Sequence, residues 1–581
     1  MKIPLKPYWE LLAKYLKPQK GLFILLAVLL FGSIGLQLVN PQIMRGFIDS
    51  ALAGAPTQQL VLSGLLFLGI AVFQQLVSVT VTYLGEKVAW TATNALRADL
   101  AWHCLTLDMD FHHKHTPGEM IERIDGDVAE LANFFSQFFI LLVGNLLLLV
   151  GILGALFLED WRVGIVFTIY ALIALVMLNR VRDLAVPEQK ARRQAEADLY
   201  GFLEEQLSST EDIRSSGAIG FSLRELYRFM TANLNISRKA EFKNLKIGWL
   251  MAGLLLVGNL LAILSGYFLY QNGSITIGTV YLFIHYMNMI ETPIWTLTHQ
   301  VQSFQTIGAC VERLIEFRKI GRSVLDGPGT AFPQGALPLR FDQVTFAYEK
   351  DDPVIHDLTF ALRPGKKLGL LGRTGSGKTT LARLIFRLYD PVQGSIAVNG
   401  SDIRQAKLDA LRQRISIVTQ DVQLFRASIR DNLTFFDREI SDEQVMRSIE
   451  ALELSDWFQS LPQGLDTMLD SGAHSLSAGE AQLLAFTRVF LRNPGLVILD
   501  EASSRLDPAT EHRIERAIDR LLDQRTAIII AHRLGTVGRV DDILILDNGT
   551  ISEYGSRETL AGDHDSRFYQ LLQTGLEEVL V

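Results

Sequence analysis

The sequence predicts a two-part protein, in which an all-α membrane domain is followed by a soluble α/β domain. Long apolar stretches crowd the first three hundred of the 581 residues. The mean hydropathy of the whole chain, +0.21, is high for a soluble protein. In the second half, short β-rich runs alternate with helical segments, a pattern typical of an α/β domain with parallel strands.

The first domain, 1–320, is expected to hold six membrane-spanning helices, because a span needs roughly 20 apolar residues. The spans are expected near 21–39, 60–83, 135–158, 163–178, 247–270 and 277–295. Lysine and arginine are absent from the short connections Ala51–Gln59 and Gln271–Gly278 but frequent before the first span and in Asn179–Lys246. By the positive-inside rule, both ends of the chain and the long loops are therefore cytoplasmic, which requires an even number of spans.

The two long loops, Glu86–Asn133 and Arg180–Lys246, are expected to extend the spans as helices into the cytoplasm, since apolar residues recur every three or four positions. Turn residues place the tip of the first loop near Phe111–Glu119 and that of the second near Ala218–Leu223. The alternative, two separate soluble insertions, is less favoured because neither loop has a strand pattern.

Composition limits the remaining possibilities. The net charge of −8 argues against a nucleic-acid partner. The two cysteines, Cys104 and Cys310, are too far apart to suggest a disulfide framework or a metal site. The segment Met1–Lys20 lacks a secretory cleavage site and is interpreted as an interfacial helix on the inner membrane surface. A frayed terminus is the alternative.

A Gly- and Pro-rich linker, 321–338, is expected to separate the first domain from the second, 339–581. The segments expected to form strands in the second domain are Leu339–Tyr348, Lys367–Leu371, Ile415–Val418, Gly495–Leu499, Ala527–Ala531 and Ile543–Leu546.

The strongest motif is the P-loop pattern, which joins a predicted strand to a predicted helix, Thr379–Leu388. It reads Gly372-Arg373-Thr374-Gly375-Ser376-Gly377-Lys378-Thr379, with Thr380 next to it. Glycines let backbone N–H groups surround phosphates, and the helix N-terminus adds positive potential. Lys378 is expected to reach the β- and γ-phosphates of ATP, and the Thr379 hydroxyl to bind Mg²⁺.

A second motif is the apolar strand that ends in Asp500-Glu501. Asp500 is expected beside the P-loop, where it holds Mg²⁺ through water. Glu501 is expected to orient or deprotonate the attacking water. Alone, the pair is common and has little specificity, but in register with a P-loop it becomes a strong signal.

Between these motifs lies Leu476-Ser477-Ala478-Gly479-Glu480, which resembles the signature sequence of ATP-binding-cassette (ABC) proteins, usually Leu-Ser-Gly-Gly-Gln. The whole chain, six spans followed by one cassette, resembles the half-size ABC exporters. The resemblance implies an ATPase coupled to transport across a membrane, with ATP and Mg²⁺ as cofactors and a second half-transporter as partner.

The same resemblance implies roles for further residues. Tyr348 corresponds to the aromatic residue that stacks on adenine, and Gln420 to the residue that contacts Mg²⁺ and senses the membrane domain. Ser504 and Asp507 belong to a loop like the one that crosses to the other cassette, and His532 resembles the histidine that contacts the γ-phosphate. The alternatives are a strand aromatic for Tyr348, a loop polar residue for Gln420 and a helix cap for His532.

In this family the signature of one cassette completes the ATP site of the other, so ATP joins two cassettes and hydrolysis releases them. Here Glu480 replaces the usual glutamine, Ala478 a glycine, and Arg505 stands where alanine is usual. A carboxylate near a triphosphate is electrostatically unfavourable. The hypothesis is a heterodimer in which this chain supplies intact catalytic residues and a weaker signature; neutral drift in a homodimer is the alternative.

The substrate is expected to be amphipathic, such as a drug, a lipid or a peptide, moved out of the cytoplasm. Tyr286, Asn288 and Glu291 on the last span are candidate substrate contacts, with simple helix packing favoured over binding. The expected location is a bacterial inner membrane, with the N-terminus and the ATPase domain cytoplasmic. A soluble ABC ATPase is excluded by the spans, and an ATP-gated channel, an importer and a protease-bearing peptide exporter are less favoured; a homodimeric exporter or lipid flippase is the alternative function.

Overall fold

The computed structural model describes residues 13–329, 331–349, 352–420, 422–469, 476–500, 508–531 and 537–574, with the backbone alone at 133–140, 181–186, 299–306, 508–509 and 574. The chain divides into two units. The first comprises Met1–Leu105 and Pro117–Ile320, and the second comprises Thr106–Thr116 and Gly321–Val581.

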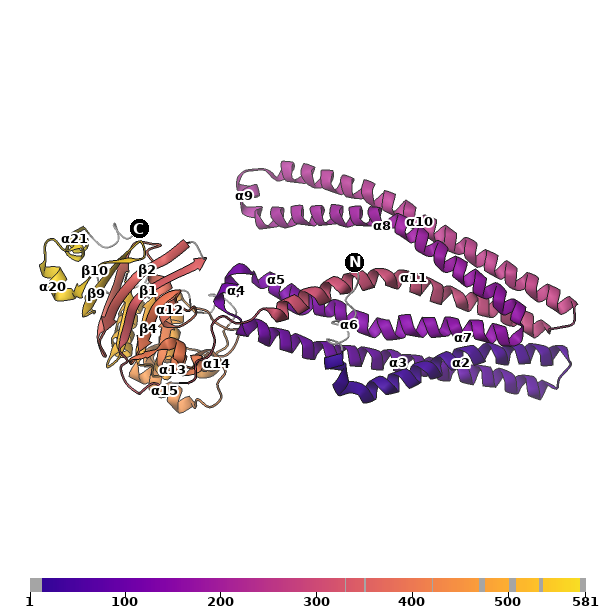
Figure 1. The fold of residues 1–581 in the computed structure, drawn as a ribbon, viewed down its shortest axis with the longest axis horizontal. Helices are drawn as coiled ribbons and strands as arrows, with labels where there is room; N and C mark the ends of the chain where they lie inside the picture. Colours follow the sequence, from indigo (N-terminus) through magenta and orange to yellow (C-terminus); the bar gives the residue numbers. More distant parts are fainter. Residues whose placement is uncertain are drawn as a thin grey trace. The chain divides into compact units, whose positions relative to one another are not determined.

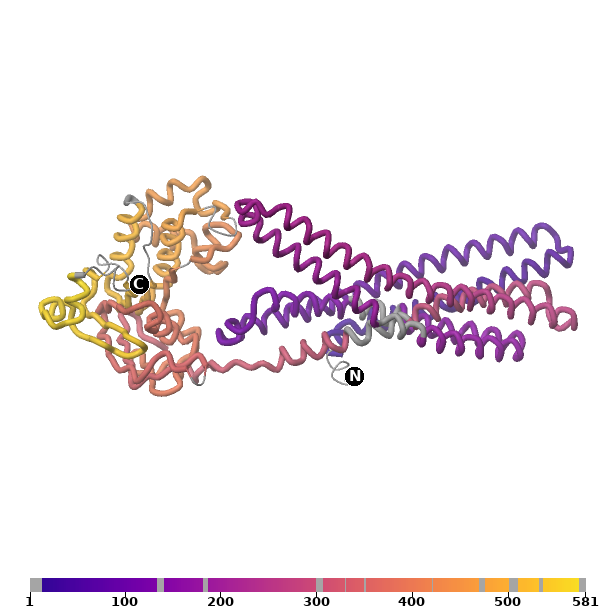
Figure 2. The backbone as a smooth tube through the Cα atoms, turned by 90° about the horizontal axis from the view of Figure 1, so that it is seen from above, coloured from indigo at the N-terminus to yellow at the C-terminus, as the bar shows by residue number. Residues whose placement is uncertain are grey.

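Long helices build the first unit (Figure 1). They are η1 (Lys17–Gln19), α2 (Lys20–Leu52), α3 (Thr57–Thr106), α5 (Pro117–Ile121), η2 (Glu122–Gly126), α6 (Asp127–Gln137), η3 (Phe138–Val143), α7 (Gly144–Glu159), α8 (Trp161–Ser208), α9 (Thr210–Ser215), α10 (Ile219–Gln271) and α11 (Ile277–Lys319). Helices α8 and α10 run side by side and are joined at α9, as Figure 2 also shows. Both expected cytoplasmic extensions are therefore helical.

Five helical stretches among the described residues are long and apolar enough to cross a membrane. They are Ala13–Leu52, Thr57–Thr106, Leu141–Glu159, Trp161–Arg180 and Ile219–Gln271. The sixth expected span is the beginning of α11, where Leu282, Phe283 and Ile290 are fully buried against other helices. Its role as a span stays a prediction.

Polar side chains join the ends of these helices. Near the short connections, Arg45 of α2 pairs with Glu159 of α7 at 2.6 Å. Asp49 accepts hydrogen bonds from the Gly278 N–H in the first turn of α11, at 2.9 Å, and from the hydroxyl of Thr276, the N-cap of α11. Such groups are expensive in hydrocarbon, and mutual pairing offsets that cost.

The tip of the second loop is a turn at Ser216–Ala218, with Gly217 at φ +65°, a left-handed conformation that favours glycine. It lies at the start of the expected Ala218–Leu223. Ile219 and Phe221 next to the turn are 53% and 60% exposed. The tip of the first loop contains α4 (Met109–Lys114), within the segment that groups with the second unit. Asp108 holds it there by accepting hydrogen bonds from Ser323 and Val324.

Two sheets form the second unit. Its remaining elements are β1 (Leu339–Glu349), β2 (Asp352–Leu362), β3 (Lys367–Gly372), α12 (Lys378–Ile385), β4 (Gln393–Val398), β5 (Ser401–Asp402), η4 (Ile403–Gln405), α13 (Leu408–Arg414), β6 (Ile415–Val418), α14 (Ile429–Thr434), α15 (Asp442–Ala451), α16 (Ser455–Gln459), η5 (Gly464–Asp466), α17 (Ala478–Leu491), β7 (Leu496–Asp500), α18 (Pro508–Leu522), β8 (Thr526–Ile530), β9 (Asp542–Asp547), β10 (Thr550–Ser556), α20 (Arg557–Gly562) and α21 (Arg567–Thr574).

The six-stranded sheet has the order β10-β9-β3-β8-β7-β6, and all its strands but β10 are parallel. The register pairs Gly372 with Leu546 and Asp500 with Ile530, so the carboxyl ends of β3, β9, β7 and β8 lie at one edge. Ligands of open parallel sheets bind at this edge.

The run Leu339–Tyr348 is a strand, as expected, but it lies outside the parallel sheet. As β1 it belongs to a four-stranded antiparallel sheet of order β2-β1-β4-β5. The physical reason is that β1 returns directly through β2, and a short connection permits only antiparallel pairing. The fold class predicted from the sequence, helical membrane domain followed by α/β cassette, is confirmed.

Candidate functional site: the P-loop cavity and the signature helix

The P-loop connects β3 to α12 and depends on its glycines. Gly372 has φ +147°, and a Cβ atom there would lie 2.4 Å from the Leu546 carbonyl oxygen. Gly377, at φ +103°, is the N-cap of α12 and forms no side-chain cap. A Cβ at Gly377 would lie 2.6 Å from the Ile355 side chain. Both positions therefore require glycine, and the start of α12 keeps N–H groups that no capping side chain occupies.

Lys378 is held inside the loop, with 6% of its surface exposed. Its ammonium donates hydrogen bonds to the carbonyls of Gly372 at 2.6 Å and Arg373 at 2.9 Å. The hydroxyl of Ser376 is buried and has no hydrogen-bond partner among the described residues. A buried cation beside an unpaired hydroxyl and a helix N-terminus fits a phosphate group, which supplies acceptors for all three.

A cavity of about 540 Å³, the P-loop cavity, brings the predicted residues together. Thr374, Gly375, Gly377, Lys378, Thr379 and Thr380 line it, together with Gln420, Asp500, Val354 and Ile530. Gln420 follows β6 and Asp500 ends β7, so sheet topology places both opposite the P-loop. The predicted catalytic residues Glu501 and His532, and Ser504 and Asp507, lie outside the described residues.

Tyr348 lies beside the P-loop helix rather than in the lining of the P-loop cavity. Its hydroxyl is 3.1 Å from the Thr380 hydroxyl and accepts a hydrogen bond from Arg383 at 3.1 Å. The ring of His113, in α4, lies 6.5 Å away, centre to centre. This contact between the first loop tip and the predicted adenine-stacking residue was not predicted, although the run His112-His113-Lys114-His115 is unusual enough to draw notice.

The signature residues form the N-terminal turn of α17. Ser477 is the N-cap: its hydroxyl accepts the Glu480 N–H at 3.3 Å, and the Glu480 carboxylate accepts the Ser477 N–H at 2.8 Å. This reciprocal pair is a capping box, in which a glutamate performs the same geometric task as a glutamine. Leu476 and Gly479 are buried, whereas Ser477 and Ala478 are exposed. None of these residues lines the P-loop cavity of its own chain.

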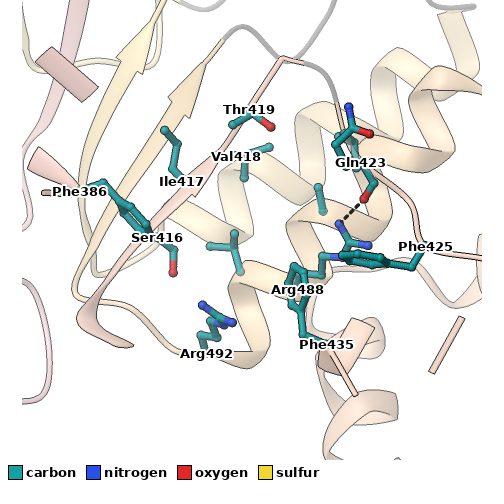
Figure 3. A pocket seen from close by; sticks show the side chains of 13 residues that line it. Phe386, Ser416, Ile417, Val418, Thr419, Gln423, Phe425, Phe435, Arg488 and Arg492 are labelled. Atoms are coloured by element: carbon teal, nitrogen blue, oxygen red, sulfur yellow. Dashed lines mark hydrogen bonds between the residues drawn. The ribbon is translucent and has the colours of Figure 1, made fainter. Parts of the chain in front are cut away.

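A groove of about 290 Å³ between β6 and α17 was missed by the sequence analysis (Figure 3). This aromatic groove is lined by Phe386, Phe425, Phe435, Arg488 and Arg492, among others. Arg488 is held by hydrogen bonds from its guanidinium to Asn432 and to the Gln423 carbonyl. Burial lowers the pKa of Arg488 to about 10. The groove adjoins both the segment after Gln420 and the signature helix α17, so a side chain bound in it would contact both segments.

The three candidate substrate residues are not gathered into one site. Tyr286 is fully buried, and its hydroxyl donates to the Leu38 carbonyl at 2.8 Å, as expected of a packing residue. Asn288 is exposed and accepts a hydrogen bond from Asn259 of α10 at 3.1 Å. Glu291 is half-buried. A neighbouring cavity is lined instead by Met289 and Thr292 of the same helix.

Comparison with known proteins identifies the family to which the chain belongs. The family model described as the ABC transporter transmembrane region matches residues 23–294, and the ABC transporter model matches residues 355–504. An uncharacterized ABC transporter ATP-binding protein of Bacillus subtilis is 31% identical, over 95% of this chain and 92% of its own. An ATP-dependent lipid A-core flippase of Idiomarina loihiensis is 29% identical, over 97% of each chain.

A solved structure of a bacterial Atm1-family ABC exporter with ATP bound has the same fold, with a TM-score of 0.77 at 24% identity, covering 96% of this chain and 98% of that one. The resemblance to half-size ABC exporters and the ATPase activity predicted from the sequence are thus confirmed. The chain belongs to the ABC transporter family, as a multi-pass membrane protein whose cassette is an ATPase coupled to transport.

Proposed function

We propose that this chain is one half of an exporter that moves an amphipathic substrate out of the cytoplasm, by alternating access driven by ATP-dependent pairing of two cassettes. The observation that carries the proposal is the separation of the two motifs. The P-loop cavity gathers Lys378, Gln420 and Asp500, but Ser477 of the same chain does not line it. Each cavity therefore needs a signature helix from a second chain.

In this proposal the P-loop N–H groups and Lys378 bind the β- and γ-phosphates, and Tyr348 stacks on the adenine. Thr379, Gln420 and Asp500 would hold Mg²⁺, since all three line the cavity and present the oxygen ligands that this ion prefers. When bound, the ion neutralises charge on the phosphates. Glu501, next to Asp500, would orient or deprotonate the attacking water, and His532 would contact the γ-phosphate.

The partner would present its signature helix to this cavity, with Ser477 of this chain doing the same in return. We propose a heterodimer, because Glu480 keeps a carboxylate within the first turn of α17, where a triphosphate must approach. The lipid A-core flippase relatives support the alternative, a homodimer. Reconstituted alone, a heterodimeric half is expected to show little turnover; full ATPase activity with both sites turning over would establish the homodimer instead.

The aromatic groove would couple the cassette to the membrane helices by receiving the second loop tip of the partner subunit. The tip complements the groove in both apolar surface and charge. Ile219 and Phe221 are exposed apolar side chains, and Glu211 and Asp212 in the first turn of α9 complement Arg488 and Arg492. In a chain free of Cys104 and Cys310, cysteines at Phe221 and Phe425 should form a disulfide-linked dimer on oxidation if two copies pair; in the heterodimer, the second cysteine is placed in the groove of the partner instead. A disulfide only within single chains would refute the exchange.

The proposed substrate class and location draw on the relatives and on the charge of the loops. Flippase relatives act on a lipid, which favours an amphipathic cargo here. The lysine- and arginine-rich loops favour a cytoplasmic N-terminus and cassette, and the proposed location is a bacterial inner membrane.

The test compares transport and ATP hydrolysis in proteoliposomes. Glu501→Gln should bind ATP but stop both hydrolysis and transport. Continued substrate movement in this variant with ATP bound would instead indicate a gated channel, the other function considered.

A further inference from the structure

The first unit contains a pocket within the membrane-spanning region, lined by residues of α2, α3, α7 and α11. Its volume is about 270 Å³. The polar side chains that line this membrane pocket are Ser33, Gln37, Ser78, Thr82, Asn145 and Thr292. Asn145 lies fourteen residues before the end of α7 at Glu159, or roughly 20 Å from it at 1.5 Å per residue, well inside the hydrocarbon.

Several of these groups lack hydrogen-bond partners. Among the described residues, the side chains of Ser33, Gln37 and Ser78 form no hydrogen bond, although Ser33 is only 4% exposed. The nearby Thr82 hydroxyl, by contrast, donates to the Ser78 carbonyl at 3.1 Å. An unpaired amide or hydroxyl in a membrane is costly, and a ligand that pairs with it recovers that cost.

A departure from regular helix shapes the same pocket. The turn η3, Phe138–Val143, is π-helical and leads directly into Gly144, which lines the pocket. Asn145 donates from its side-chain amide to the Leu141 carbonyl inside this turn, at 2.6 Å. That bond fixes the amide nitrogen, while the side-chain oxygen accepts no hydrogen bond from the described residues. Wide turns of this kind occur often at functional sites.

The charge of the lining sets the ligand class. The described residues that line the pocket include hydroxyls, amides and apolar side chains such as Leu30, Ile34 and Leu148, and no ionisable group. A phosphate or carboxylate would have no cation to pair with here, and an isolated charge in an apolar medium is far costlier than a neutral polar group. A hydroxyl- or amide-bearing molecule would find both donors and acceptors.

We propose that the membrane pocket binds the uncharged polar group, hydroxyl or amide, of an amphipathic ligand whose hydrocarbon part lies along the apolar side chains of α2 and α7. This inference rests on the proposed export function and specifies its substrate class as neutral at this position. Gln37 contributes the amide with the most unused hydrogen-bonding capacity.

The test measures binding of monooleoylglycerol and of oleoyl lysophosphatidic acid to the purified full chain without nucleotide, by native mass spectrometry. The two probes share their acyl chain and glycerol, and differ by a phosphate. Monooleoylglycerol should bind more tightly. Gln37→Met, which keeps the side-chain length, should weaken its binding about tenfold, the effect of one lost hydrogen bond with a stranded partner.

Gln75→Met is the matched control, because Gln75 is an exposed amide on α3 that does not line the pocket. This variant should bind monooleoylglycerol as tightly as the parent chain does. Tighter binding of oleoyl lysophosphatidic acid, or unchanged monooleoylglycerol binding in Gln37→Met, would overturn the proposal. A Gln37→Met chain with a raised melting temperature and unchanged binding would mean that the pocket holds only water, and would also overturn it. Since no nucleotide is present, failure here is distinct from failure of ATP-driven export, which Glu501→Gln tests.

Discussion

Two helix N-termini in the same cassette, those of α12 and α17, are built in opposite ways. The first is preceded by Gly377, has no side-chain cap and carries Lys378 at its first position. The second is closed by a capping box between Ser477 and Glu480. Both have the positive end of a helix dipole, but only α12 leaves its N–H groups unoccupied by side chains.

The N-terminus of α12 can therefore bind a phosphate as it stands, whereas at α17 the phosphate must first displace the capping carboxylate. At α12, phosphate oxygens would replace the Gly372 and Arg373 carbonyls as acceptors of the Lys378 ammonium. At α17, an incoming phosphate would compete with the Glu480 carboxylate for the Ser477 N–H and would be repelled by its charge. ATP is therefore expected to bind more tightly to the P-loop of one chain than to the signature helix of the other chain.

The largest effect is expected at α12. Lys378→Ala removes the only cation among the described residues that line the P-loop cavity, and should lower the ATPase rate by about 10²–10³-fold. Steady-state hydrolysis by the reconstituted transporter measures this. Lys366→Ala is the control, because Lys366 pairs with Asp541 outside the cavity and should keep most of the activity. Equal losses in both variants would contradict the role of Lys378.

The body of α17 is expected to matter more for stability than for nucleotide binding. Arg488→Met strands the Asn432 and Gln423 carbonyls and should destabilise the cassette by about 2–4 kcal/mol. Thermal unfolding of the full chain measures it. Arg492→Met, on the same face over Phe435 but exposed, should cost under about 1 kcal/mol. A similar cost for both would mean that the hydrogen bonds of Arg488 contribute nothing.

A moderate effect is expected at the N-terminus of α17. Glu480→Gln keeps an oxygen for the capping box but removes the charge, so ATP-driven pairing should need about three- to tenfold less ATP. The gain should shrink at high salt. ATPase rates against ATP concentration measure it, with Glu450→Gln on the exposed face of α15 as the control. An unchanged half-saturation at low salt would show that the carboxylate is neutral in the proposed interface.

The smallest effect concerns the strand that leads into the P-loop. Burial acts to raise the pKa of Asp541, but hydrogen bonds from the Lys367 N–H and the Lys366 ammonium outweigh it, and the pKa is lowered. A lowered carboxyl pKa stabilises the fold above the ordinary pKa, and the contribution is lost as the pH falls through the folded value. Asp541→Asn should lower the melting temperature by about 2 °C at pH 7.

That difference should vanish as the pH falls through the lowered pKa of the folded Asp541 carboxyl, because the parent carboxyl is then protonated as well. Melting temperatures of both chains across this range are the measurement. If the difference in melting temperature between the two chains stayed the same in acid, the destabilisation by Asp541→Asn would be due to packing rather than to charge.

The fold class, the P-loop and the family could all be predicted from the sequence, because each depends on short-range patterns. Apolar runs of sufficient length must be helices in a membrane. The local turn demands a glycine at φ +147° or +103°, so the spacing of Gly372 and Gly377 in the motif is recognisable from the residues alone. The carboxyl end of an apolar strand likewise marks Asp500.

Which distant residues share a surface was decided by the packing of the folded chain. It placed Leu339–Tyr348 in a separate antiparallel sheet, joined Gln420 to the P-loop cavity, and packed Arg488 into a groove that no local pattern marks. It also made Tyr286 a buried packing residue and gathered Gln37, Ser78 and Asn145 from three helices. Helical periodicity tells which residues share a face, but which faces meet depends on how whole helices pack, which no single segment encodes.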